Sequence, residues 1–145
     1  MKETWPPDRV FKDTKVRVRY AETDRMGVAY YANYLIWFEV GRSEYCRQIG
    51  FSYAEMEQES NCVLVVTQAH CRYRRSVTYD DELTIRTWVK ELRKRALVFA
   101  YLIQRSDDGR IIAEGETQHL VVDRSGKPIS MPERFFRLMQ DGQSQ

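Results

Sequence analysis

The feature that most constrains the fold of this chain is a change in the period of its apolar residues. Residues 30–49 carry apolar side chains at helical spacing, whereas the sequence after residue 62 alternates with a period of two or runs β-branched and aromatic. The first half of residues 30–49 is apolar almost all round, which is typical of a helix buried inside its domain. Gly50 follows directly, where glycine commonly ends a helix. The sequence therefore predicts one long, buried helix.

The rest of the pattern predicts strands around this helix. One strand is expected in "KVRVRYAE", residues 15–22, and a short second helix in "SYAEMEQES". Later strands, separated by the turn-forming stretches "TYDDE", "RKR" and "SDDG", are expected at residues 62–76, 83–92, 97–106 and 110–122. Connections this short leave no room for the crossover that parallel neighbours require. We therefore expect an α+β fold in which a curved antiparallel β-sheet wraps around a long central helix.

Length and composition predict a single domain over residues 1–145. Two prolines, Pro6 and Pro7, disfavour helix near the start, so residues 1–14 are expected to form a loose N-terminal arm. Residues 140–145, "QDGQSQ", are expected to be a frayed tail. No apolar run approaches the roughly 18 residues of a membrane span, and the first residues lack the apolar segment of a signal peptide.

Cysteine count and net charge narrow the possible partners. Cys46, Cys62 and Cys71 form an odd set without metal-binding spacing, which predicts reduced thiols in the cytoplasm and no metal site. The net charge of +2 is too small to favour nucleic acid, and the aromatic residues fall mostly in elements expected to be buried. We expect no nucleic-acid partner and no cofactor.

Apolar residues on both faces of the predicted sheet indicate an assembly. Trp88 falls on the face opposite to Leu83, Ile85 and Val89. In residues 97–106 both faces are apolar, with Leu97, Phe99, Tyr101 and Ile103 on one side and Val98, Ala100 and Leu102 on the other. Such a sheet needs cover on both faces, and little predicted helix remains to supply it. A homo-oligomer is therefore expected.

A motif ahead of the central helix carries a family resemblance. The pattern Tyr20-x-Glu22-x-Asp24-x-x-Gly27-x-x-Tyr30-Tyr31-x-Asn33-Tyr34 resembles that of hotdog-fold acyl-CoA thioesterases of the 4-hydroxybenzoyl-CoA thioesterase type. The similarity extends through "FEVGRSEYCRQIGFSY" and "SVTYDDELTIRTWVKELRKRALVF" and covers most of the chain. It implies a hotdog fold and hydrolysis of a thioester to a free acid and coenzyme A.

The resemblance also implies roles for individual residues. Asp24 matches the catalytic carboxylate, acting as nucleophile or general base, and Gly27 matches a glycine that lets the loop pass close to the ligand. Tyr31 matches the position whose backbone N–H points at the thioester oxygen. The chemistry is consistent, because the first turn of a helix offers unpaired N–H groups and a positive dipole end, while an apolar helix body excludes water. Glu22 is expected to be structural or solvated.

A basic turn, Arg93, Lys94 and Arg95 in "KELRKR", is the expected contact for the phosphates of coenzyme A, as in similar thioesterases. Arg124 and Lys127 could add to it. The alternative interpretation of such a run is a solvated surface. Similar thioesterases pair their sheets edge to edge and place each site between two subunits. The resemblance therefore implies a dimer of dimers, a homotetramer, in which Asp24 and the basic turn at one ligand come from different chains.

Alternative interpretations remain open at this point. Glu39 or Glu44 could be the catalytic acid, as in another hotdog branch, although Glu39 is three residues from Arg42 and is expected to pair with it. His70 is expected to face outward, and His119 to be a hydrogen-bonded core residue. A hotdog dehydratase would need a histidine that the acidic loop lacks. The other rivals are a non-catalytic module that binds acyl thioesters and a thioesterase acting on acyl carrier protein.

Overall fold

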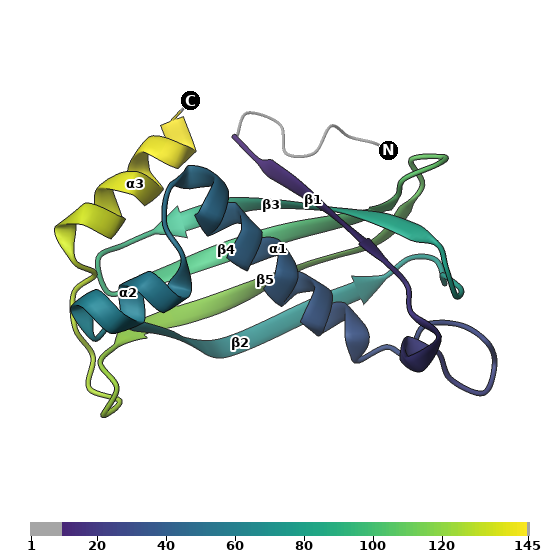
Figure 1. Ribbon diagram of the computed structural model, residues 1–145, viewed down its shortest axis with the longest axis horizontal. Helices are drawn as coiled ribbons and strands as arrows, with labels where there is room; N and C mark the ends of the chain where they lie inside the picture. Colours follow the sequence, from purple (N-terminus) through teal and green to yellow (C-terminus); the bar gives the residue numbers. More distant parts are fainter. Residues whose placement is uncertain (1–9, 145) are drawn as a thin grey trace.

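A computed structural model describes residues 10–144 as a sheet with one helix laid across it (Figure 1). The elements are β1 (Lys12–Arg17), the 3-10 turn η1 (Tyr20–Glu22), α1 (Asn33–Ile49), α2 (Tyr53–Ser60), β2 (Val63–Tyr73), β3 (Glu82–Leu92), β4 (Ala96–Arg105), β5 (Ile111–Val122) and α3 (Glu133–Ser144). Five strands pair antiparallel in the order β1-β3-β4-β5-β2. The expected α+β architecture with a central helix is therefore confirmed.

The first strand begins earlier than its sequence pattern indicates. Lys12 lies opposite Thr87 in the β1–β3 ladder, and Asp13 accepts hydrogen bonds from the Arg86 guanidinium at 2.9 and 3.0 Å. The expected loose arm is therefore wrong for residues 12–14, and residues 1–9 lie outside the described part of the chain. The pattern misled because β1 is an edge strand with one half-exposed face, where polar residues are tolerated.

The expected frayed tail is also wrong for residues 140–144, which belong to α3, and Gln145 lies outside the described part of the chain. Phe135, Met139 and Gly142 are buried at helical spacing. A Cβ at Gly142 would lie 3.1 Å from the Tyr45 hydroxyl and from Ile49, so this glycine lets α3 lie close against α1. A residue that the sequence indicates as a helix breaker is thus a packing position.

Small residues on the inner face of the sheet let α1 approach it closely. Alternate residues of β5 form the face that packs against the helix: Ala113, Gly115, Thr117, His119 and Val121. A Cβ at Gly115 would lie 2.7 Å from the Phe38 ring, and the same ring stacks on Tyr101 with centroids 4.3 Å apart. At Gly41 of α1, a Cβ would lie 2.6 Å from Thr87 Oγ1. The core therefore depends on glycines in both the helix and the sheet.

The apolar side chains on the outer face of the sheet are less exposed than predicted. Trp88 does cluster with Ala100 and Leu102, away from the helix, but Trp88 is 5% exposed and Leu102 is 2% exposed within the single chain. They do not form the apolar patch in water that was expected. Exposed apolar side chains do occur on β2, where Val65 and Val66 are 42% and 44% exposed. Among residues 10–144 this 11-residue strand pairs with β5 alone, which leaves its other edge open.

Candidate active site

A tight hairpin holds the predicted catalytic carboxylate. Thr23 and Ala29 form an antiparallel bridge, and the Asp24 N–H donates to the Val28 carbonyl at 2.9 Å. The Gly27 N–H donates to the Asp24 carbonyl at 3.0 Å, and Gly27 has φ +82°. A three-residue hairpin loop commonly ends in such a left-handed residue. Gly27 is thus required by the conformation of this loop, and no described atom would lie within 4 Å of an added Cβ.

The carboxylate of Asp24 is exposed and oriented by its own loop. Its Oδ1 accepts the N–H of Met26 at 2.9 Å, while Oδ2 has no hydrogen-bond partner within residues 10–144. The pKa of Tyr30 is raised above its ordinary value, first by a hydrogen bond with Tyr31 and by less through the charge of Asp24. The effect of its charge indicates that Asp24 lies near Tyr30, which precedes α1. One carboxylate oxygen remains available for chemistry.

Glu22 ties the acid loop, residues 20–30, to α1. Its side chain is 6% exposed and accepts hydrogen bonds from the Arg19 N–H at 2.8 Å and from Trp37 Nε1 at 3.3 Å. Its backbone carbonyl accepts from the Tyr30 N–H and from Asn33 Nδ2, both at 2.8 Å. These contacts agree with a structural role for Glu22 and place the loop rigidly ahead of the helix.

The start of α1 offers unpaired backbone donors. The first bonded groups are the N–H of Asn33, which donates to the Tyr30 carbonyl at 3.0 Å, and the N–H of Tyr34, which donates to the Tyr31 carbonyl at 3.3 Å. The N–H groups of Tyr31 and Ala32 precede them and have no partner in the described part of the chain. Free N–H groups and the helix dipole together favour negative charge here. Asp24 and Gly27 lie in the hairpin directly ahead of these donors, and Glu22 and Tyr30 tie that hairpin to the helix start.

Aromatic side chains surround these donors. Tyr30 and Tyr31 have ring centroids 4.7 Å apart, and Tyr34 packs edge-on against Trp37 at 4.9 Å. Tyr73, at the end of β2, lies edge-on to Tyr34 at 4.9 Å and donates its hydroxyl to the Tyr31 carbonyl at 3.0 Å. Tyr73 was not predicted as a site residue. Its strand alternation indicates which face it lies on, but no local pattern indicates a partner 42 positions away.

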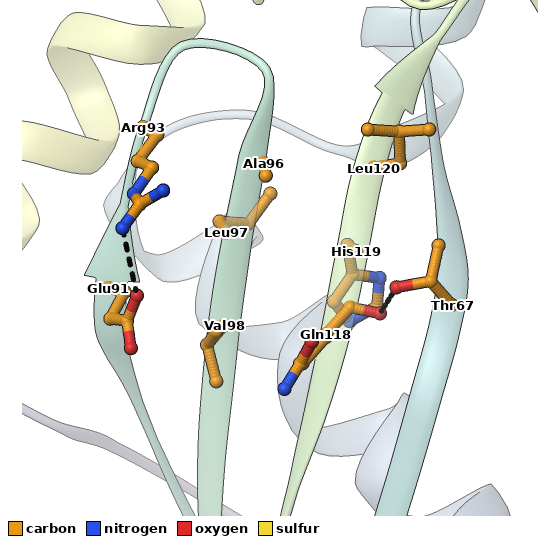
Figure 2. Close-up of a pocket in the computed structure, with 9 residues that line it drawn as sticks. All are labelled: Thr67, Glu91, Arg93, Ala96, Leu97, Val98, Gln118, His119 and Leu120. Carbon is orange, nitrogen blue, oxygen red and sulfur yellow. Dashed lines mark hydrogen bonds and ion pairs between the residues drawn. The ribbon is translucent and has the colours of Figure 1, made fainter.

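The basic turn lies elsewhere on the sheet. The N–H of Arg93 donates to the Ala96 carbonyl at 2.9 Å, which closes the turn, and the side chains of Arg93, Lys94 and Arg95 are exposed. Figure 2 shows Arg93 folded back toward Glu91, 4.0 Å away, at a hollow that Val98 and Gln118 also line. The turn is held by the Met131 N–H, which donates to the Lys94 carbonyl at 2.7 Å. Its guanidinium and ammonium groups are available to a ligand from solvent.

Within one chain, the acid loop and the basic turn do not meet. The acid loop follows Arg17, which lies opposite Glu82 at the beginning of β3, and Val28 bridges to Thr78 just before that strand. The basic turn follows the other end of β3, whose 11 residues span about 35 Å. Figure 1 shows the loop beside the start of α1 and the turn at the opposite end of the sheet, near α2 and α3.

Of the rival groups, Glu44 and His119 have structural partners, whereas Glu39 is exposed. Glu39 and Arg42 do not form the expected ion pair, and Arg42 Nη1 instead lies 3.4 Å from the Tyr101 hydroxyl. Glu44 pairs with Arg47. His119 Nε2 lies 2.7 Å from Thr117 Oγ1, and burial lowers the pKa of this imidazole to about 3. The expected core role of His119 is confirmed.

The described residues contain no candidate for a metal site or for a membrane-spanning helix. His70 is exposed, as expected. In the described range 10–144, no cluster of three His, Cys, Asp or Glu side chains could hold a metal ion. No helix in that range is long and apolar enough to cross a membrane.

Both the sequence and the fold of this chain are similar to those of known thioesterases. Residues 18–137 match the sequence profile of the thioesterase-like superfamily. YneP of Bacillus subtilis, provisionally named an acyl-CoA thioesterase, is 34% identical over 122 residues, which cover 83% of this chain and 87% of that protein. A DHNA-CoA thioesterase structure from Staphylococcus aureus has a TM-score of 0.83 at 34% identity, over 91% of this chain and 87% of the other. A 4-hydroxybenzoyl CoA thioesterase, 20% identical over 90% of this chain and 99% of that one, shares the fold with a TM-score of 0.81.

Proposed function

Because this chain belongs to the thioesterase-like superfamily, we propose that it hydrolyses an acyl-CoA thioester to a free acid and coenzyme A. The expected hotdog fold and family are confirmed, and the chain is a thioester hydrolase by family. The observation that carries the proposal is the placement of Asp24 ahead of the free N–H groups of Tyr31 and Ala32. The coenzyme A thioester is supported by the names of the relatives that share a third of the sequence.

The site supports two routes that begin with Asp24. As a general base, Asp24 takes a proton from water, and the hydroxide adds to the thioester carbonyl carbon. As a nucleophile, its carboxylate adds to that carbon and forms a mixed anhydride, which water then hydrolyses. In both routes the carbonyl oxygen gains negative charge, which the Tyr31 N–H stabilises by a hydrogen bond. Collapse of the tetrahedral intermediate breaks the C–S bond, and the thiolate of coenzyme A leaves and takes up a proton.

The open edge of β2 supports a two-fold assembly. A long unpaired edge strand with exposed apolar residues is a template for pairing with a second chain. If β2 pairs antiparallel with its copy over its full length, Val63 of one chain would lie beside Tyr73 of the other. Tyr73 lies at the end of the sheet beside the acid loop, where it contacts Tyr31. Val63 lies at the opposite end, where it pairs with Val122 close to the basic turn. Asp24 of one subunit and the partner's basic turn would then lie at the same end of the joined sheet.

We therefore include in the proposal a homodimer joined through β2, with the homotetramer as a dimer of such dimers. The exposed side chains of Val65 and Val66 lie on this edge and would be covered by it. A cytoplasmic location is also part of the proposal. It is supported by Cys46, Cys62 and Cys71, which are free thiols, as a reducing compartment would keep them.

The test is thiol release from a panel of aromatic and aliphatic acyl-CoA thioesters, with wild type and Asp24→Asn. We expect Asp24→Asn to lower turnover by about a hundredfold or more, because the amide cannot attack or accept a proton. Its unfolding free energy should stay unchanged, since the residue is exposed and the amide oxygen still accepts the Met26 N–H. Asp141→Asn, an exposed aspartate on α3, is the matched control.

Three other outcomes of this assay would change the proposed catalytic residue or the proposed function. If Asp24→Asn keeps more than about a third of the wild-type rate, Asp24 is structural, and Glu39 and Glu44 are tested next. Binding of acyl-CoA without thiol release would favour the non-catalytic module. Release from acyl carrier protein alone would replace coenzyme A as the thiol partner.

A further inference from the structure

The hydroxyl of Tyr73 connects the edge strand to the start of α1. It donates to the Tyr31 carbonyl at 3.0 Å, from a strand 42 residues further along the chain. We propose that Tyr73 is a positioning residue for hydrolysis, which holds the Tyr31–Ala32 peptide so that two consecutive N–H groups, those of Tyr31 and Ala32, donate to the thioester oxygen. This inference rests on the proposed function and adds a second donor to it.

The peptide bond between Tyr31 and Ala32 is planar. The carbonyl of Tyr31 and the N–H of Ala32 belong to one rigid peptide unit. A hydrogen bond to that carbonyl therefore fixes the direction of the Ala32 N–H and polarises it. The preceding unit is held in the same way, because the Tyr30 carbonyl accepts the Asn33 N–H at 3.0 Å. Both free donors thus belong to peptides whose carbonyls are already bonded.

The helix alone holds the second peptide weakly. The Tyr31 carbonyl also accepts the Tyr34 N–H, but at 3.3 Å, beyond the usual N–H···O distance of about 2.9–3.0 Å. The hydroxyl of Tyr73 supplies the shorter contact. The pKa of Tyr73 is raised to about 12, first by the partial burial of its hydroxyl and then by the neighbouring Cys71 thiol, so the hydroxyl is protonated at neutral pH and can donate.

The position of Tyr73 separates a catalytic effect from a structural one. Its side chain is 45% exposed, and its ring packs edge-on against Tyr34 and Tyr31 without help from the hydroxyl. Water can replace a hydroxyl contact at such a site, so its removal costs little stability. The direction of the Ala32 N–H matters when charge develops on the substrate oxygen, which places the effect on turnover rather than on affinity.

The experiment compares Tyr73→Phe with wild type in the thiol-release assay. The change keeps the ring and removes the donor, so we expect turnover to fall about tenfold while KM stays within about twofold. Tyr79→Phe is the matched control, because Tyr79 is exposed and packs edge-on against Tyr20 rather than against the helix start. Equal turnover in Tyr73→Phe and wild type would overturn the inference.

A second measurement needs no substrate. The backbone ¹⁵N–¹H signal of Ala32 and the ¹³C signal of the Tyr31 carbonyl should shift in Tyr73→Phe and stay in place in Tyr79→Phe. Unchanged signals in Tyr73→Phe would mean that the hydrogen bond does not form in solution. A wild type that releases no thiol would refute the proposed function, while these signals would still report on the contact.

Ala32→Pro tests the second donor directly. Ala32 has φ −68°, which a proline ring adopts, and its N–H has no partner among the described residues. Folded Ala32→Pro with reduced turnover supports the inference, and wild-type turnover overturns the claim of two donors. Should this variant fail to fold, turnover and chemical shifts of Tyr73→Phe decide the matter.

Discussion

Two groups of polar residues pack against α1, and they differ mainly in their access to water. At the helix start, Asp24, Tyr31 and Tyr73 are exposed, and backbone donors are free. At the middle of the helix, a buried polar chain runs from Arg42 through Tyr101 and Thr117 to His119, with contacts of 3.4, 2.6 and 2.7 Å. The first group can meet a substrate, and the second can only hold the fold together.

Burial decides the charge state of the second group. The pKa of His119 is lowered to about 3, first by burial and then by the positive charge of Arg42. The pKa of Tyr101 is raised, again chiefly by burial. Both side chains are therefore neutral near pH 7 and have no proton to exchange with a substrate. On the proposed function, polar groups around one helix would thus serve reactivity at its start and stability at its middle.

The largest expected effect concerns His119 and the dependence of stability on pH. The folded-state pKa of about 3 lies below the unfolded value of about 6.5, so the unfolded chain binds the proton more readily in between. The stabilisation is complete above about pH 6.5 and is lost as the pH falls toward 3, by about 1.4 kcal/mol per pH unit. Urea unfolding measured at intervals from pH 7 to pH 4 would show this slope.

The control for that prediction is His119→Gln, which removes the titrating group and keeps a hydrogen-bonding partner for Thr117. Its unfolding free energy should fall less steeply with acid than that of wild type, because carboxylates titrate in both proteins. Parallel slopes in the two proteins would contradict the assignment of His119 as a neutral core residue.

The next effect concerns Thr117, the central member of the buried polar chain. Thr117→Val removes the hydroxyl that lies between Tyr101 and His119, and leaves both without this partner. We expect the unfolding free energy to fall by about 2 kcal/mol, with turnover unchanged. Ser130→Ala, which removes a hydroxyl from an exposed loop position outside β2, is the control and should change stability by less than about 0.5 kcal/mol. A loss of turnover in Thr117→Val would show that the buried polar chain also affects the reaction, and not only the stability.

The smallest expected effect extends the comparison to the basic turn, which is exposed like the helix start but lies far from its donors. Neutralising Arg93 and Lys94 to glutamine should raise KM for acyl-CoA about tenfold and leave turnover nearly unchanged, because remote phosphate contacts serve ground and transition states alike. An acyl thioester without the nucleotide should respond little. Equal losses on both substrates would show that the turn does not contact coenzyme A.

Mixing two variants tests whether the site is shared between subunits. A hybrid of one Asp24→Asn chain and one chain with the neutral basic turn would contain one intact site, if Asp24 and the turn come from different chains. Activity at low acyl-CoA should therefore rise when the two variants are unfolded and refolded together. No gain on mixing, or an active monomer in light scattering, would argue against the shared site.

The sequence determined the local features of this protein. Apolar periodicity predicts α1 and the later strands to within a few residues, and Gly50, with φ +123°, ends α1 as expected. The acid loop was expected from the family resemblance of its motif, and the structure adds that Gly27 has the left-handed φ that a tight turn requires. Such features depend on neighbours along the chain, which the sequence displays directly.

Only the tertiary structure decided which distant groups meet. The pairing of Lys12 with Thr87 places the first strand, and the close approach of Gly142 to α1 places the last helix. The contact of Tyr73 with Tyr31 and the separation of Asp24 from the basic turn have the same origin. These depend on strand register and on the packing of helices against the sheet, which bring together residues dozens of positions apart. A pattern of period two or 3.6 indicates the face on which a residue lies, but not which residue of another element it contacts.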